Sequence, residues 1–237
     1  GDFYVLNGAK VFITNGGYAD TFVVFAMTDK TKGTKGISAF IMEKGMPGFS
    51  IGKKEHKMGI RGSNTCELIF EDVKVPKENL LGPLGKGFAV AMTTLDGGRI
   101  GIAAQALGIA EGALDVTIEY VKQRVQFGKP LCKHQAISFM LADMKTKCEA
   151  ARELVYHAAY EVDMHEKDAT MYASMAKYFA CETAIKVISD ALQIFGGYGY
   201  SREYQIEQIY RDIRVCAIYE GSSQVQQMVI SGALLGK

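Results

Sequence analysis

The fold is decided by residues 86–125, which read KGFAVAMTTLDGGRIGIAAQALGIAEGALDVTIEYVKQRV. Apolar residues in this stretch recur at every third or fourth position, the spacing of one face of an α-helix. In the residues before this stretch, short apolar runs follow the period of two that is typical of β-strands. They end at Gly82-Pro83, a pair of residues that interrupts regular secondary structure. The change of period predicts a β domain in residues 1–82 and a helical domain in residues 83–237.

The β domain is expected to be an antiparallel sheet or a partial barrel. Residues 4–6 and 9–13 are predicted to form a hairpin about Asn7-Gly8, because Asn-Gly suits the positive φ angles of a type I′ turn. Further strands are expected at residues 21–28, 36–43, 49–54 and 65–75. Several short strands with no helix between them favour antiparallel pairing.

The helical domain is expected to be an antiparallel bundle. Its first helix should stop before Gly128-Lys129-Pro130, and Gly196-Gly197 is typical of a helix C-cap. The other predicted helices cover residues 134–165, 169–194, about 203–211 and from about 222 onward. The predicted fold class is therefore α+β and multidomain, with a partial antiparallel β domain followed by an all-α helical bundle.

Composition excludes several classes of protein. The 27 Lys and Arg residues balance 26 Asp and Glu residues, so the basic excess of a nucleic-acid binder is absent. No apolar run approaches the roughly 18–20 residues that span a bilayer, which predicts no membrane span. Five scattered cysteines without CxxC spacing indicate reduced thiols rather than disulfides or a zinc site.

Two further features concern the start of the chain and a candidate metal site. The chain enters a strand pattern at once, without an initiator Met or a signal peptide, so we expect it to be part of a longer protein. His157, Glu161 and His165 share a helix face, but acidic and basic neighbours indicate a solvated helix end rather than a metal site.

The residues around Glu220 combine a carboxylate with a helix start. Gly221 follows, and Ser223 with Gln226 three residues later forms a capping-box pattern. Backbone N–H groups at a helix N-terminus can hold an anion or a polarised oxygen. A general base and an oxyanion stabiliser could thus share one turn, although an acidic residue at a helix start is also common.

Three other stretches of sequence have both a functional and a structural interpretation. Arg124 with Phe127 could bind a pyrophosphate and a ring, or could be a surface Arg beside a buried Phe. Asp96 and Arg99 could adjoin a ligand beside Gly97-Gly98, or could form a plain ion pair within the helix. Residues 196–199 are glycine-rich but follow a helix, so they do not match a Rossmann fingerprint. They could be a helix C-cap, or a backbone that approaches a ligand closely.

Six stretches together resemble the acyl-CoA dehydrogenase family, most closely its short-chain, butyryl-CoA type, over essentially the whole chain. They occur in the family's order, at residues 12–16 (FITNG), 57–61 (KMGIR), 70–76 (FEDVKVP), 124–130 (RVQFGKP), 193–199 (QIFGGYG) and 218–224 (IYEGSSQ). The resemblance implies a β middle domain, truncated at its N-terminus, and a C-terminal helical domain, arranged around FAD.

The resemblance also implies binding residues. Those for FAD are Phe12, Ile13, Thr14, Arg124, Gln126, Phe127, Gln135, Gln193, Ile194, Phe195, Gly196, Gly197, Ser222, Ser223 and Gln224. Those for the acyl-CoA substrate are Asp96, Arg99, Tyr219 and Gly221. Phe12 stands where the family more often has Trp, which keeps an aromatic wall but loses an indole N–H.

Glu220 matches the family's catalytic base. Some members place the acid on the long helix instead, at the position of Gly98, which has no side chain here. The implied reaction is α,β-dehydrogenation of a short-chain acyl-CoA thioester, in which Glu220 removes the α proton and a hydride passes from the β carbon to flavin N5. The backbone N–H of Glu220 is implied as a donor to the thioester oxygen.

The resemblance also implies partners and a compartment. They are electron-transferring flavoprotein as electron acceptor and a homo-oligomer, a tetramer or a dimer. The compartment is the bacterial cytoplasm, or the mitochondrial matrix in a eukaryote. The alternatives are the reverse, enoyl-CoA reductase direction, and an inactive fragment or assembly module. Because the family's N-terminal domain is absent, we expect these 237 residues alone to bind FAD weakly and to be impaired.

Overall fold

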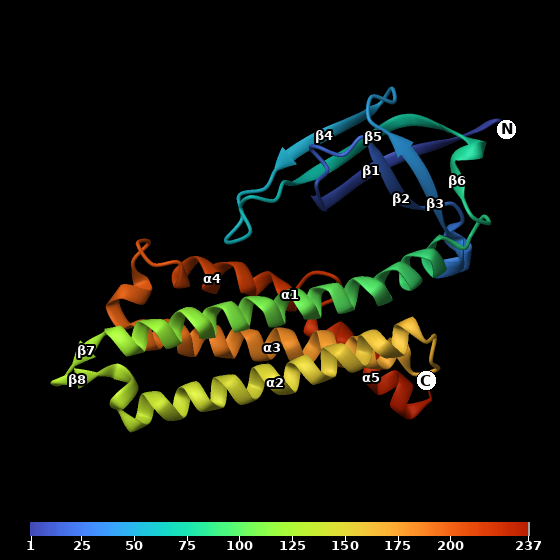
Figure 1. The fold of residues 1–237 in the computed structure, drawn as a ribbon. Helices are drawn as coiled ribbons and strands as arrows, with labels where there is room; N and C mark the ends of the chain where they lie inside the picture. Colours follow the sequence, from blue (N-terminus) through green and yellow to red (C-terminus); the bar gives the residue numbers. More distant parts are fainter. Residues whose placement is uncertain (237) are drawn as a thin grey trace. The chain divides into compact units, whose positions relative to one another are not determined.

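The computed structural model describes residues 1–236. It divides into two compact units, Gly1–Thr94 and the part from Leu95 onward, and each is described by itself. Figure 1 shows strands along the first part of the chain and helices along the rest. The expected antiparallel β part followed by a helical part is confirmed. The domain boundary at residues 82–83 stays a prediction, since helix α1 (Gly87–Gln123) continues across the division between the compact units.

The first unit contains two antiparallel sheets of three strands each. One has the order β1 (Phe3–Thr14), β5 (Thr65–Pro76), β4 (Phe49–Lys54). The other has the order β2 (Thr21–Met27), β3 (Ile37–Glu43), β6 (Leu80–Leu81), with the 3-10 helices η1 (Lys30–Gly36) and η2 (Lys77–Asn79) before β3 and β6. The four strands expected from residue 21 onward are thus found within one or two residues of their predicted bounds.

The core of this unit follows the two-residue period. In β5 the buried apolar side chains are Cys66, Leu68 and Phe70 and then, after a change of phase, Val73 and Val75. The phase changes at Asp72, whose φ of 51° interrupts the pleat. Buried residues of the other strands pack with them, namely Leu6, Phe22, Val24, Phe40 and Met42.

The hairpin predicted at Asn7-Gly8 is wrong. Strand β1 continues through both residues and pairs with β5 on either side of a register shift between Leu6 and Gly8. Gly8 has a φ of 137°, and the Asn7 side chain accepts a 2.8 Å hydrogen bond from the N–H of Asp72. Asn-Gly therefore forms a β-bulge, which needs the same positive φ as a turn and satisfies the partner backbone with a polar side chain.

The second unit is built on long helices. After α1 come α2 (Gln135–Asp163), α3 (Ala169–Phe195), α4 (Ile206–Ile213) and α5 (Ser223–Leu235). The 3-10 helices η3 (Leu131–Lys133), η4 (Gly196–Tyr200) and η5 (Arg214–Ala217) join them. Gly196 caps α3 with a φ of 60°, as its sequence position predicted.

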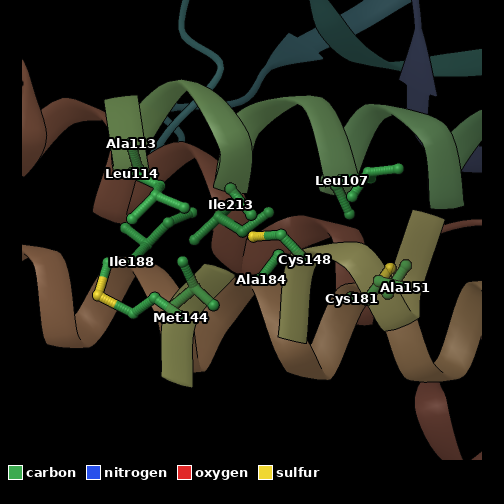
Figure 2. Packing of buried hydrophobic residues seen from close by; sticks show 14 of the residues in the cluster. Leu107, Ala113, Leu114, Met144, Cys148, Ala151, Cys181, Ala184, Ile188 and Ile213 are labelled. Carbon is green, nitrogen blue, oxygen red and sulfur yellow. The ribbon is translucent and has the colours of Figure 1, made fainter. Parts of the chain in front are cut away.

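Small side chains bring these helices close together. Figure 2 shows Leu107 and Leu114 of α1, Met144 and Cys148 of α2 and Ile188 of α3 packed with Ile213 of α4. Alanines such as Ala151 and Ala184 fill the positions between the larger residues. This packing joins α1, α2, α3 and α4 in one core.

A short hairpin follows α1 where only a helix stop was expected. Strands β7 (Val125–Gln126) and β8 (Lys129–Pro130) pair across Phe127 and Gly128, which have φ values of 52° and 79°. Two successive positive φ angles are those of a type I′ turn. The helix therefore ends at Gln123, two residues before the predicted end at Val125.

Helix α1 also bears on the expectation of no membrane span. It contains an 18-residue window with a mean hydropathy of 1.2, long and apolar enough to cross a membrane by length and composition alone. The same helix supplies Ala103, Ala106 and Leu107 to the core, and core helices of proteins without membrane spans meet the same criterion. The absence of a membrane span stays a prediction.

Candidate active site

A strained turn between η5 and α5 carries Glu220. Glu220 has a φ of 53° and Gly221 a φ of 90°. A side chain in the left-handed region costs about 1–2 kcal/mol, which glycine avoids. Glu220 is half-buried, and the strain persists because both neighbouring elements are packed into the helical unit. Such outliers are concentrated at functional sites.

The carboxylate of Glu220 lies against the backbone of Gly98 in α1. A Cβ at position 98 would be 2.7 Å from Glu220 Oε2 and 3.4 Å from its Cδ. Only a residue without a side chain leaves this space to the carboxylate. The glycine that breaks the helical pattern of residues 86–125 is thus explained by a close approach from another part of the chain.

A hydrogen-bond donor is available in the same turn. Among residues 1–236 the backbone N–H of Glu220 has no acceptor, whereas the N–H groups of Ile218 and Tyr219 both bind the carbonyl of Val215. Glu220 therefore offers both a carboxylate and an uncommitted N–H. Chemically, this pair suits a reaction in which a proton leaves a carbon atom while charge builds on a neighbouring oxygen.

Two buried side chains hold the carbonyl groups of the turn. Lys177 of α3 donates to the Gly221 carbonyl at 2.5 Å, and Gln226 Nε2 of α5 donates to the same oxygen at 2.9 Å. Gln226 Nε2 also lies 3.3 Å from the carbonyl oxygen of Glu220. Burial lowers the pKa of Lys177 below its usual value of 10.5. The turn is thus fixed from the interior side of the helical unit.

The capping box expected at Ser223 and Gln226 is wrong by one residue. Ser222 is the N-cap of α5, and its hydroxyl accepts a long, 3.5 Å hydrogen bond from the N–H of Val225. Ser223 is buried and donates to Glu182 of α3 at 2.5 Å. Gln226 turns back to the carbonyls of Glu220 and Gly221, because the left-handed turn leaves both without a helical partner.

Asp96 and Arg99 form the ion pair that their spacing allows. Arg99 donates to Asp96 Oδ1 at 2.7 Å, and the Arg99 side chain is only 5% exposed. Thr170 donates to the other oxygen of Asp96 at 2.9 Å, and the Arg99 guanidinium lies 3.5 Å from the buried Ser174 hydroxyl. The Nε atom of Arg99 has no partner among residues 1–236. The pair thus anchors α1 to α3.

Arg124 opens onto a cleft at the other end of α3. The cleft has a volume of about 590 Å³, and its lining includes Tyr120, Arg124, Gln126, Ile194, Phe195, Gly196 and Gly197. The guanidinium lies 4.9 Å from the ring centroid of Tyr198 and forms no ion pair with residues 1–236. An unpaired Arg beside glycine backbone can bind a phosphate-bearing ligand.

Phe12, Ile13 and Thr14 lie near the end of β1 in the first unit. Phe12 is 71% exposed and has a φ of 58°, at a register shift between Lys10 and Ile13. Thr14 is exposed and pairs with Thr65 of β5. An exposed aromatic residue in a strained bulge fits a surface that contacts a planar ligand.

The remaining predicted residues lie outside these groups. Phe127 is 93% exposed at the hairpin tip, and Gln135, Gln193 and Gln224 are exposed. Tyr219 donates its hydroxyl to Gln105, and burial raises its pKa.

Sequence reasoning missed Lys177 and Ser174. Both lie on the buried stripe of α3, where Ala173, Ala180 and Ala184 follow helical spacing. A lysine at a core position of an apolar stripe was the signal that could have found it, because an uncompensated buried charge is costly.

The end of α2 was predicted to be a solvated helix end rather than a metal site. His157 and Glu161 lie 3.5 Å apart there as a pair. Within residues 1–236 no group of three His, Cys, Asp or Glu side chains could hold a metal ion.

Two family models match this chain. The acyl-CoA dehydrogenase middle domain matches residues 1–73, and the acyl-CoA dehydrogenase C-terminal domain matches residues 85–235. The short-chain specific acyl-CoA dehydrogenase of Megasphaera elsdenii is 62% identical over 98% of this chain and 60% of its own. A relative from Acetobacterium woodii, caffeyl-CoA reductase-Etf complex subunit CarC, is 57% identical over 100% of this chain and 62% of its own.

A solved structure shares the fold. The three-dimensional structure of butyryl-CoA dehydrogenase from Megasphaera elsdenii superimposes with a TM-score of 0.96 and 62% identity, covering 98% of this chain and 61% of that one. The chain spans about three-fifths of the length of the curated relatives that it matches. With two domain models in order and relatives of this identity, the chain belongs to the acyl-CoA dehydrogenase family.

Proposed function

We propose that the protein to which this chain belongs catalyses FAD-dependent α,β-dehydrogenation of a short-chain acyl-CoA thioester, with Glu220 as the base. The observation that carries the proposal is the carboxylate of Glu220, held by a left-handed turn against the bare backbone of Gly98. The names of relatives that act on short-chain and butyryl-CoA substrates support the substrate class.

In the proposed reaction Glu220 removes the proton from the α carbon of the thioester. That proton is weakly acidic, so the thioester oxygen must be stabilised as it gains negative charge. The backbone N–H of Glu220, which has no acceptor among residues 1–236, supports this role, because it could donate to the thioester oxygen. Asp96 and Arg99 are proposed to lie along the substrate, with Tyr219 and Gly221 at the thioester.

The family is one of FAD-dependent flavoproteins. The residues fit this group, because the Arg124 guanidinium forms no ion pair with residues 1–236 and lies beside a glycine backbone with open space at Gly196 and Gly197. We propose that Arg124, Gln126, residues 193–197 and Gln135 hold FAD on the helical unit. Phe12, Ile13 and Thr14 would hold it on the β unit, and Phe127 and Ser222 to Gln224 complete the proposed set. When bound, FAD accepts the hydride from the β carbon of the substrate.

The test uses the full-length protein with its flavin. Glu220→Gln should retain FAD and bind butyryl-CoA, while the rate of flavin bleaching by butyryl-CoA falls by a factor of about 10²–10⁴. Glu119→Gln, at an exposed carboxylate of α1, is the matched control and should bleach at the wild-type rate. Bleaching of Glu220→Gln at the wild-type rate would refute the assignment.

A second candidate function is the reverse reaction, reduction of an enoyl-CoA. The Acetobacterium woodii relative, which is named as a caffeyl-CoA reductase subunit, favours it. The same groups serve both directions, because Glu220 would then deliver the proton that it otherwise removes. Stopped-flow reoxidation of the reduced protein by crotonyl-CoA, compared with its reduction by butyryl-CoA, measures which direction is faster.

The proposed electron partner is electron-transferring flavoprotein. The name of the Acetobacterium woodii relative includes an Etf complex, which supports a partner of this class. A homo-oligomer, a tetramer or a dimer, and a cytoplasmic or mitochondrial-matrix location complete the proposal. An inactive fragment or assembly module is the alternative, and flavin content after gel filtration tests it.

A further inference from the structure

Lys177 is an unusual residue for its place in the fold. It lies on the buried face of α3 with no exposed surface, among Ala173, Ala180 and Cys181. Burying an ammonium group is costly unless a partner compensates for the lost water. A methionine would fill the same space without that cost, as hydrophobic replacements of buried charges often do. A structural role in packing alone therefore does not account for a lysine here.

The ammonium group of Lys177 binds the turn that carries Glu220. Its one hydrogen bond among residues 1–236 is the 2.5 Å bond to the carbonyl of Gly221, directly after Glu220. It forms no ion pair with a carboxylate in the same part of the chain. Glu220 and Glu182 are the carboxylates whose charge raises the pKa of this ammonium, against the larger lowering by burial.

Helix α3 holds the turn at two points. Lys177 binds Gly221, and Glu182 accepts a 2.5 Å hydrogen bond from the buried Ser223 hydroxyl. Gln226 adds the second donor to the Gly221 carbonyl from the side of α5. With the carbonyl of Gly221 fixed in this way, the peptide planes on either side of it cannot rotate. The φ values of 53° and 90° at Glu220 and Gly221 are thereby maintained against their strain.

We propose that Lys177 is a positioning residue for Glu220: its buried ammonium fixes the Gly221 carbonyl and so aims the Glu220 carboxylate at the space beside Gly98. This inference rests on the proposed role of Glu220 as base. A displacement of about 1 Å at a reacting group lowers a rate by roughly 100-fold. Loss of the Lys177 contact should therefore act on proton removal and leave substrate binding nearly intact.

The experiment compares Lys177→Met with Lys186→Met in the full-length, flavin-loaded protein. Lys186 lies on the same helix, but its ammonium is exposed and pairs with Asp190, so it is the matched control. We expect Lys177→Met to keep its flavin and its KM for butyryl-CoA, while kcat falls by roughly 10- to 100-fold. The deuterium isotope effect with α-deuterated butyryl-CoA should increase, because proton removal becomes slower. A smaller folded fraction alone would lower kcat without changing the isotope effect.

A second readout does not depend on activity. Amide hydrogen exchange of a peptide covering residues 218–223 should be faster in Lys177→Met than in wild type, whereas a peptide covering residues 195–201 should be unchanged. If wild type fails to bleach with any acyl-CoA but exchange still rises at residues 218–223, the proposed function fails, while the support of the turn at Glu220 and Gly221 by Lys177 stands. Unchanged kcat, isotope effect and exchange in Lys177→Met would overturn the positioning role even if wild type is fully active.

If Lys177→Met does not fold, Lys177→Gln tests the positioning role of Lys177. Its shorter, neutral amide cannot place a donor where the lysine ammonium lies. A lower kcat with a raised isotope effect in Lys177→Gln would support the inference. Wild-type values of both in folded Lys177→Gln would refute it.

Discussion

The carboxylate of Glu220 occupies the space that a side chain at Gly98 would need. A Cβ on Gly98 would be 2.7 Å from Glu220 Oε2, below the distance that real Cβ contacts reach. The two residues are 122 positions apart in the chain, and the packing of α1 with the segment before α5 brings them together. The glycine at position 98 thus leaves the room that the carboxylate of Glu220 occupies.

Gly98→Ala should separate stability from activity. Alanine raises helix propensity by about 1 kcal/mol over glycine, so the thermal midpoint should be maintained or raised. The new methyl group should displace the Glu220 carboxylate and lower the rate of flavin bleaching by butyryl-CoA by roughly 10- to 100-fold. Differential scanning calorimetry and stopped-flow absorbance measure the two effects.

The matched control is Gly108→Ala on the same helix. A Cβ at Gly108 would have no heavy atom within 4 Å, so this variant should gain helix propensity and bleach at the wild-type rate. Equal bleaching rates in Gly98→Ala and Gly108→Ala would contradict the close approach of Glu220 to α1.

Much of the fold follows from local sequence patterns. The strands from residue 21 onward and the long helices were predictable, because one buried face per element imposes a period of two or of 3.6 on the apolar residues. The hairpin predicted at Asn7-Gly8 was wrong, because a β-bulge and a type I′ turn both need a positive φ. Only the pairing of β1 with β5 distinguishes the two.

The site was predictable only in part. Glu220 stood out as a carboxylate before a helix, and the family resemblance gave it a role. Its contact with Gly98, 122 residues away, and the bond from Lys177 to Gly221, 44 residues apart, depend on tertiary packing. No local pattern encodes such distances. The shift of the helix cap from Ser223 to Ser222 arises in the same way, because Glu182 of α3 claims the Ser223 hydroxyl.

The ion pair of Asp96 and Arg99 should respond unequally to removal of its two partners. The Arg99 side chain is 5% exposed and that of Asp96 is 27% exposed, so Arg99 depends more on its partner for solvation. Asp96→Asn should leave a buried guanidinium without a counter-charge and lower the free energy of unfolding by about 1.5–3 kcal/mol. Arg99→Met should cost less, because water can still reach Asp96.

Thermal and urea unfolding of both variants would test this order of stability. The double variant Asp96→Asn with Arg99→Met gives the coupling between the two side chains. A larger loss for Arg99→Met than for Asp96→Asn would show that the aliphatic packing of Arg99 outweighs the solvation of its charge.

Lys177 should give the protein a distinctive response to alkaline pH. Burial lowers the pKa of Lys177 in the folded state below 10.5, although Cys181, Cys216, Glu220 and Glu182 act in the opposite direction. Between the folded and the unfolded pKa the unfolded chain binds more protons, so the stability contributed at this position rises with pH. The cost of the buried charge is therefore full below the folded pKa of Lys177 and disappears as the pH approaches 10.5. The difference in free energy of unfolding between wild type and Lys177→Met should shift in favour of wild type from pH 7 to pH 10.5. Lys186→Met should show no such shift between pH 7 and pH 10.5, because the bond to Asp190 raises the pKa of Lys186 and its stabilisation is lost only as the pH rises through that raised pKa. Thermal midpoints of the three proteins in matched buffers measure both differences, and a difference between wild type and Lys177→Met that stays constant with pH would mean that the lysine titrates alike in the folded and unfolded chains.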